Sequence, residues 1–242
     1  MILVDNVTKI YNEQTVALDK MSFTIDKGEI VGFIGPNGSG KTTTMKILAG
    51  VINANSGDVI VNNYNIKEQP ILVKQSIGYI SDSPDMFLRL KGIDFLNFIS
   101  DVYNVNKDDR KTRIEYLSNL FEIKDVLSLP MLSYSHGMRQ KIMVVSTLLH
   151  EPDVWILDEP LTGLDPKSAF ILKSMMKEHA KKGKSVFFST HVLEVAEKLC
   201  DKVIIIFKGQ KLFEGTLDNL QKEYPRKALE EIFLLMTDEK DT

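Results

Sequence analysis

The chain has little cysteine, no long hydrophobic run and no excess of positive charge. Cys200 is its only cysteine, which excludes an internal disulfide framework and a cysteine-based metal site. No apolar run reaches the roughly 18 residues that a membrane span needs, and the N-terminus lacks the basic region and cleavage site of a signal peptide. We therefore expect a soluble cytoplasmic protein, which leaves open a peripheral association with a membrane through a partner.

The overall charge limits the class of partner. The chain has 242 residues, with 30 Lys and Arg against 33 Asp and Glu, for a formal net charge of −3. A nucleic-acid-binding domain ordinarily carries a basic excess or stripe, so we expect no nucleic-acid partner. The length suits one large α/β domain with a sizeable core, and we expect a single domain over residues 1–242.

Residues 35–42 match the phosphate-loop pattern G-x-x-x-x-G-K-[ST]. An apolar strand-like run at 29–34 leads into them and a helical pattern at 43–49 follows. Backbone N–H groups of such a loop surround phosphate oxygens, and the partial positive charge of the helix N-terminus adds to them. We expect Lys41 to reach the β- and γ-phosphates of a nucleotide and Thr42 to ligate Mg²⁺. The expected nucleotide-binding residues here are Gly35, Pro36, Asn37, Gly38, Ser39, Gly40, Lys41, Thr42 and Thr43.

The rest of the chain changes pattern three times. Residues 1–30 alternate apolar and polar positions and predict antiparallel strands, and a second strand pair is expected at 57–61 and 64–66. Residues 88–127 show helical spacing. After about residue 140, helices and short apolar strands alternate, which is typical of a mainly parallel sheet with crossover helices. The helix expected at 167–181 has a good start at Asp165 and Pro166 and a good stop at Gly183. His150 and His179 are expected at the surface or at helix ends.

Two carboxylates end one of the apolar strands. Asp158 and Glu159 directly follow the strand expected at 154–157, and ligands of open parallel sheets bind at the carboxyl ends of the strands. Asp158 is positioned to hold the Mg²⁺ bound by Thr42 through water, and Glu159 to orient and polarise an attacking water. Together with the phosphate loop, this pair predicts hydrolysis of a bound nucleoside triphosphate.

At this point the sequence resembles the nucleotide-binding subunits of ABC transporters, over nearly the whole chain. Residues 132–140 are similar to the family signature L-S-G-G-Q-x-Q, with Ser135 and Gly137 at two of its positions, whereas His136 and Met138 depart from it. The form Y-S-x-G-M is similar to one bacterial exporter subgroup. Ser135 still offers a hydroxyl and Gly137 close backbone approach, at the expected start of a helix.

The resemblance implies both the fold and the partners. It implies a P-loop NTPase (RecA-like) α/β core, an N-terminal antiparallel β-subdomain and an inserted α-helical subdomain. The expected segments are about 1–75 for the β-subdomain and phosphate-loop core, 83–145 for the helical subdomain, and 146–242 for the core sheet and C-terminal helix. It also implies a second ATPase subunit, whose Ser135 and Gly137 complete the site, and an integral membrane subunit.

The resemblance further implies roles for four other parts of the chain. Residues 161–165 resemble the segment that crosses the dimer interface. His191 matches the switch histidine that contacts the γ-phosphate, and Tyr11 the aromatic that stacks on adenine. Asp82 stands where the family usually has a glutamine between Mg²⁺ and the membrane-coupling segment. An aspartate is shorter and charged, but it can accept a hydrogen bond from a metal-bound water.

Two other functions compete with an ATPase subunit of a membrane exporter. A GTPase is one, because residues 106–109 match the guanine-reading pattern N-K-x-D. That tetrapeptide lies in a polar stretch between helices and not after a buried strand, which favours chance. A soluble ABC-type ATPase of translation or DNA maintenance is the other. Such proteins usually carry two ATPase domains or a long coiled coil, and this sequence has neither.

Overall fold

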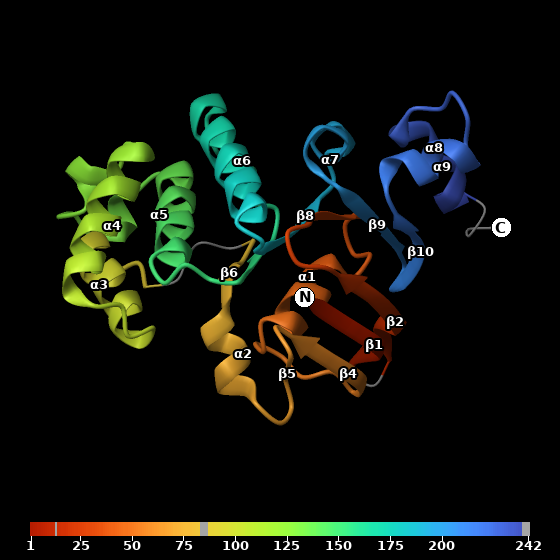
Figure 1. The fold of residues 1–242 in the computed structure, drawn as a ribbon, viewed down its shortest axis with the longest axis horizontal. Coiled ribbons are helices and arrows are strands. Elements are labelled where there is room, and N and C mark those ends of the chain that lie inside the picture. The colour runs from red at the N-terminus through yellow and green to blue at the C-terminus, as the bar shows by residue number, and fades with distance from the viewer. Residues whose placement is uncertain (13, 83–86, 239–242) are drawn as a thin grey trace.

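The computed structural model describes residues 1–12, 14–82 and 87–238 (Figure 1). Within them, two sheets lie side by side in the core. The smaller sheet is antiparallel, in the order β2-β1-β4-β5, as the alternation of its residues predicts. Asn62 and Asn63, in the tight turn between β4 and β5, have positive φ angles of 50° and 70°. Its strands are β1 (Ile2–Tyr11), β2 (Thr15–Ile25), β4 (Ser56–Val61) and β5 (Tyr64–Asn65).

The larger sheet has the order β10-β9-β3-β8-β7-β6 within the described chain. Five of these strands are parallel, and only β10 runs antiparallel, against β9. Every residue of the central strands β3, β7 and β8 is buried, as expected for a parallel sheet with both faces covered. The strands are β3 (Ile30–Ile34), β6 (Ile77–Ile80), β7 (Val154–Leu157), β8 (Ser185–Thr190), β9 (Lys202–Phe207) and β10 (Gln210–Gly215).

Helices cover the parallel sheet and form a separate arm. Figure 1 places α3, α4 and α5 in one group at one end of the molecule. β10, α8 and α9 lie at the opposite end. The helical arm and most of the strands agree with the sequence-based expectation, whereas α2, β6, β10 and α8 were not predicted. The helices are α1 (Lys41–Leu48), α2 (Pro70–Ser76), α3 (Gly92–Val102), α4 (Lys107–Leu120), α5 (His136–Leu148), α6 (Pro166–Lys181), α7 (Leu193–Leu199), α8 (Leu217–Glu223) and α9 (Leu229–Asp238).

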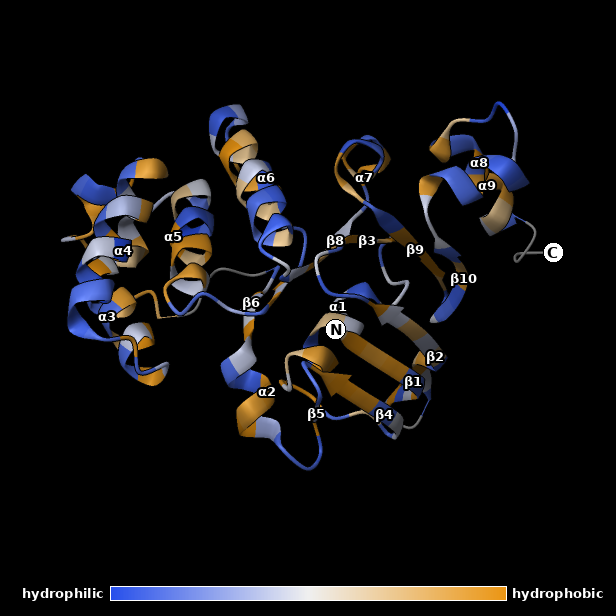
Figure 2. Cartoon of the chain, viewed as in Figure 1, coloured by the Kyte–Doolittle hydropathy of each residue, from blue (hydrophilic) through white to orange (hydrophobic). Residues whose placement is uncertain are grey.

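The strands of the parallel sheet separate two hydrophobic cores. On β7, Trp155 and Leu157 face the core shared with the helical arm, while Val154 and Ile156 face the core shared with α1 and the antiparallel sheet. Alternate residues of a strand point to opposite faces, so one short strand contributes to both cores. The apolar residues along β1 and β4 are visible in Figure 2.

The predicted helix boundaries are correct where capping residues mark them. Asp165 caps α6 by accepting a hydrogen bond from the Ser168 amide at 2.9 Å, and Pro166 is the first helical residue. The helix ends two residues before Gly183, which has φ 77°. The division at residues 75, 83 and 145 stays a prediction, and its boundary at 83 lies outside the described residues, as do residues 239–242 at the end of the predicted domain.

His150 and His179 lie at helix ends, as expected, but neither is an ordinary surface residue. His179 is 8% exposed and lies beside Trp155. His150 stacks on Tyr103, with ring centroids 3.7 Å apart, and its Nε2 lies 2.9 Å from the Ile77 carbonyl oxygen. Burial lowers the pKa of each histidine to about 4. Both imidazoles are therefore neutral in the folded protein at pH 7.

We predict that these histidines make the fold sensitive to mild acid. Between pH 6.5 and 4 the unfolded chain binds protons that the folded chain does not, so the free energy of unfolding falls as the pH is lowered through this window. The loss is on the order of 3 kcal/mol per histidine at its limit. Urea denaturation at pH 7.5 and 4.5 measures it. His150→Gln, which keeps a donor for the Ile77 carbonyl, and His179→Leu are each expected to flatten the dependence; equal pH slopes in all three proteins would contradict the prediction.

Candidate functional site

The phosphate loop connects β3 to α1 and closes around the side chain of Lys41. The Lys41 ammonium donates to the carbonyl oxygens of Gly35, at 2.7 Å, and Pro36, at 3.1 Å. Gly38 and Gly40 have φ angles of 78° and 108°, in the region that favours glycine. A Cβ on Gly40 would lie 2.6 Å from the carbonyl oxygen of Ala17. The loop therefore needs glycine here for both conformation and space.

A cavity of about 220 Å³ opens over this loop. Asn37, Gly38, Gly40 and residues 41–43 form one side of it, and Asp82 and Glu159 contribute carboxylates. The predicted phosphate-binding residues and two of the predicted acidic residues thus meet at a single cavity. The buried Ser39 hydroxyl has no hydrogen-bond partner, so the loop retains polar capacity for a ligand.

Asp158 lies at the carboxyl end of β7, beside the end of β8. Its Oδ1 accepts a 2.5 Å hydrogen bond from the Ser189 hydroxyl, and its buried Oδ2 has no partner. Burial raises the pKa of Asp158, while the nearby hydroxyl groups of Ser189 and Thr42 act in the opposite direction. A buried carboxylate with one unsatisfied oxygen, next to a threonine hydroxyl, is suited to a cation or to water bound by a cation.

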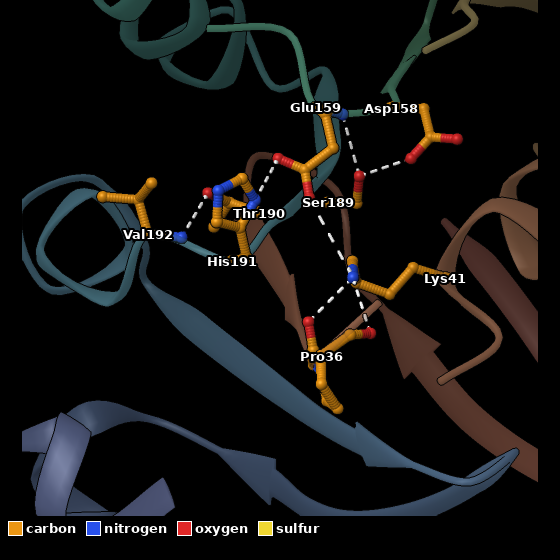
Figure 3. A network of polar contacts seen from close by, with 9 residues as sticks. Pro36, Lys41, Asp158, Glu159, Ser189, Thr190, His191 and Val192 are labelled. Carbon is orange, nitrogen blue, oxygen red and sulfur yellow. Dashed lines mark hydrogen bonds and ion pairs between the residues drawn. The ribbon is translucent and has the colours of Figure 1, made fainter. Parts of the chain in front are cut away.

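Glu159 is held between two basic side chains at the mouth of this cavity (Figure 3). Its Oε1 lies 3.9 Å from the Lys41 ammonium, and its Oε2 lies 3.0 Å from Nδ1 of His191. Burial lowers the pKa of Lys41, and the charges of Glu159 and Asp158 raise it in part. The three predicted catalytic side chains therefore form one contact network that joins the ends of β7 and β8 to α1.

Two of the remaining predicted site residues, Ser135 and Gly137, lie at the N-terminus of α5. Ser135 caps the helix by accepting a hydrogen bond from the Met138 amide at 3.3 Å. A Cβ on Gly137 would lie 2.7 Å from the Gly163 carbonyl oxygen, so only glycine fits against that neighbouring loop. Neither residue lines the phosphate cavity of its own chain.

Tyr11 also lies apart from the cavity. It ends β1, is 36% exposed and has the Lys9 ammonium 5.2 Å from its ring centroid. Its ring is accessible to a flat ligand, but it does not line the cavity over the phosphate loop. Adenine stacking on Tyr11 therefore stays a prediction.

The guanine-reading pattern has a structural explanation. Asn106 caps α4 by accepting a hydrogen bond from the Asp109 amide at 2.9 Å. Lys107 and Asp108 are the first residues of that helix. The tetrapeptide is thus a helix start on the arm, as its polar surroundings favoured, and it contributes no residue to the cavity over the phosphate loop.

Sequence reasoning missed two contacts of the site. Ser189 touches both Asp158 and Glu159, although its only sequence signal is its place two residues before His191 at the end of a buried strand. Gln140 of α5 is buried and donates to the carbonyl oxygen of Pro160, directly after Glu159. Finding either contact needs the relative register of strands or helices, which a sequence pattern does not supply.

The family profile described as ABC transporter matches residues 18–162. The chain belongs to the ABC transporter family. It is 34% identical to the ABC transporter ATP-binding protein NatA of Bacillus subtilis, covering 90% of this chain and 89% of NatA. It is 33% identical to the ABC-type transporter ATP-binding protein EcsA of the same organism, covering 99% and 97%.

A solved structure of an ATP-binding subunit of an ABC transporter has the same fold. It superposes with a TM-score of 0.92 at 31% identity, covering 98% of this chain and 99% of that structure. The predicted P-loop NTPase fold is thereby confirmed. This chain is the ATP-binding subunit of an ABC transporter. No helix among the described residues has the length and apolar character to span a membrane.

The residues around the cavity fit a nucleotide-bound Mg²⁺. Thr42 and Asp82 line the cavity and Asp158 lies close to both, and the oxygens of these three side chains are of the type that suits a hard cation. No cluster of three or more His, Cys, Asp and Glu side chains able to hold a metal occurs in the described ranges. Mg²⁺ is commonly held by one or two carboxylates together with water and substrate phosphates, so the sparse protein ligand set fits this ion.

We predict that replacing Asp158 stabilises the protein free of metal and nucleotide. The pKa of Asp158 is raised, so the folded state binds more protons than the unfolded state, and stability falls as the pH rises above the pKa of an unfolded aspartate, about 3.9. Asp158→Asn should therefore unfold at higher urea than the unmodified protein at pH 7.5 in EDTA, with the difference vanishing near pH 4.

The matched control is the exposed residue Asp125. Asp125→Asn is expected to change the free energy of unfolding by no more than about 0.5 kcal/mol. A lower urea midpoint for Asp158→Asn than for the unmodified protein at pH 7.5 would mean that the ionised carboxylate stabilises the fold, which would contradict the prediction.

Proposed function

We propose that this subunit hydrolyses Mg-ATP and that hydrolysis drives a membrane ABC exporter. The main support is the position of Glu159, whose carboxylate lies between Lys41 and His191 at the mouth of the phosphate cavity. A carboxylate at this point faces the terminal phosphate of a nucleotide on the loop. It can orient a water molecule and accept its proton as the phosphoryl group is transferred.

Each residue of the network has a distinct role in this proposal. The loop amides and Lys41 position the phosphates and stabilise charge that develops on them. Thr42 and Asp158 hold Mg²⁺, and Asp82 accepts a hydrogen bond from water on that ion. Bound Mg²⁺ neutralises negative charge on the phosphates. His191 contacts the γ-phosphate and keeps the Glu159 carboxylate oriented.

A second ATPase subunit completes each site in the proposed mechanism. Ser135 is exposed and caps α5 away from the cavity of its own chain, so its free helix N-terminus is available to a phosphate held by another subunit. Two subunits in head-to-tail arrangement close around two ATP molecules, and hydrolysis reopens them. The pair is either two copies of this chain or this chain with a related one.

Closing and opening move helices of an integral membrane subunit, which brings the ATPase to the cytoplasmic face of the cell membrane. The names of the relatives, as ATP-binding proteins of transporters, support a membrane partner. Export is favoured by the resemblance of residues 134–138 and of the C-terminal helix to exporter subunits. The competing function is that of a soluble ABC-type ATPase without a membrane partner.

We predict that three substitutions affect hydrolysis differently. Lys41→Ala abolishes ATP binding and turnover, because the phosphates lose the buried cation of the loop. Glu159→Gln keeps ATP binding but lowers kcat by roughly 100-fold or more, because removal of a general base costs about that much. Asp82→Ala raises the Mg²⁺ concentration that gives half-maximal turnover. Phosphate release and nucleotide binding measure these effects.

A surface variant serves as the reference. Lys177→Ala, at an exposed position of α6, is expected to keep unmodified turnover and nucleotide affinity. Full turnover by Glu159→Gln together with loss of turnover in Lys41→Ala would remove Glu159 from the role of base. Preference for GTP over ATP in a competition assay would restore the GTPase alternative.

We also predict recovery of an integral membrane protein with this subunit. The Glu159→Gln variant with ATP should hold the closed dimer, so affinity purification from detergent-solubilised native membranes should yield a membrane protein in a near one-to-one ratio. Recovery of ribosomal or DNA-associated proteins alone would contradict the exporter and support the soluble ATPase. Lys41→Ala, which cannot close around ATP, is the matched control for nucleotide-dependent recovery.

A further inference from the structure

Ser189 is buried between the two carboxylates of the site. It is the fifth residue of β8, which lies between β3 and β7 in the sheet. In the parallel register, Phe188 is opposite Leu157 and Ser189 is opposite Phe33. Asp158 follows Leu157, so the register itself brings the Ser189 hydroxyl to the end of β7. Ser189 has no exposed surface.

The Ser189 hydroxyl makes one hydrogen bond to each acidic residue. It donates to Oδ1 of Asp158 at 2.5 Å and accepts from the backbone amide of Glu159 at 2.9 Å (Figure 3). An ionised carboxylate can only accept, and a backbone N–H can only donate. The direction of both bonds is therefore fixed by chemistry, and one hydroxyl group connects the two residues.

This arrangement orients Asp158. Because Oδ1 is engaged by Ser189, the carboxylate cannot rotate without losing that bond in a fully buried position. Oδ2 has no partner in the protein. Ser189 thereby presents a single, defined oxygen of Asp158 for interaction with a cation or its water.

The same hydroxyl stabilises an unusual backbone at Glu159. Glu159 has φ 47°, in the left-handed region that is unfavourable for a residue other than glycine. The Glu159 amide is tied to Ser189 in this conformation. The side chain then extends toward Lys41 and His191, which lie on opposite sides of its carboxylate.

We propose that Ser189 is a positioning residue that aligns the metal-binding carboxylate of Asp158 with the Glu159 carboxylate through one shared hydroxyl. The proposal rests on the function proposed above, and it adds a residue that touches neither nucleotide nor metal. Groups that orient a metal ligand or its neighbour typically account for 10–100-fold in metal affinity or activity. Ser189 belongs to this class, and the alignment requires its hydroxyl group.

The test compares variants that differ in the hydroxyl alone. Ser189→Thr and Ser189→Val add the same volume to the buried position, but only threonine keeps the hydroxyl. Ser189→Ala removes it without added atoms. Ser185→Ala is the control, because Ser185 is equally buried on the same strand and its hydroxyl donates to the Asp26 carbonyl at 2.9 Å, away from the site.

Two measurements distinguish positioning from stability. The first is the Kd of Mn²⁺, as a probe for Mg²⁺, by electron paramagnetic resonance in the presence of ADP. The second is the split between kcat and the KM for ATP at saturating Mg²⁺. In Ser189→Ala and Ser189→Val we expect Mn²⁺ affinity and kcat to fall roughly 10–100-fold with a smaller change in KM. Ser189→Thr should recover most of both, and Ser185→Ala should leave both unchanged while unfolding more easily.

The outcomes separate this proposal from the function on which it rests. Equal Mn²⁺ affinities in the threonine, valine and alanine variants and in the unmodified protein would overturn the role of Ser189, whatever the rate of hydrolysis. Equal losses in all three variants would also overturn it, since the hydroxyl would then make no difference. An unmodified protein that binds Mn²⁺ and ADP but turns over no ATP would refute the proposed hydrolysis. The Mn²⁺ affinities of the Ser189 variants would then still decide the positioning role of Ser189.

Discussion

The parallel pairing of β3, β8 and β7 is the constraint on which the site depends. Each of these strands ends at the same edge of the sheet, and each is followed by a residue group of the site. The phosphate loop follows β3, the two carboxylates follow β7, and His191 follows β8. Lys41 and Glu159, more than a hundred residues apart in the sequence, therefore lie within ion-pair distance, at 3.9 Å, because the strand ends are fixed by backbone pairing.

The sequence predicted the parts of this arrangement that have local causes. Three such features are the phosphate loop, the Asp165 cap and the buried strand before Asp158. Each depends on neighbouring residues, so the sequence alone locates it. The shared contacts of Ser189 depend on how β8 and β7 are aligned, which no local pattern encodes. The stacking of His150 on Tyr103, the residue that follows α3, similarly depends on packing between segments far apart in the sequence.

The helical arm contacts the site through helix α5. At the N-terminus of α5, Gly137 packs on the loop that contains Gly163, and Gln140 bonds to Pro160 next to Glu159. Lys141 adds an ion pair of 2.8 Å to Asp165. The signature segment and the loop after Glu159 are thus in direct contact within one chain. A shift of the arm cannot occur without rearranging these contacts, the nearest of which, at Pro160, is one residue from the proposed base.

The side chains of β7 alternate between two separate cores, with Trp155 and Leu157 on one face and Val154 and Ile156 on the other. In mechanical terms the strand is clamped from both sides, since close-packed interiors have low compressibility. The strand therefore keeps its position and does not deform. Any displacement of Glu159 during a working cycle must therefore arise in the loop beyond the strand, where rotation about a few backbone bonds is the available hinge.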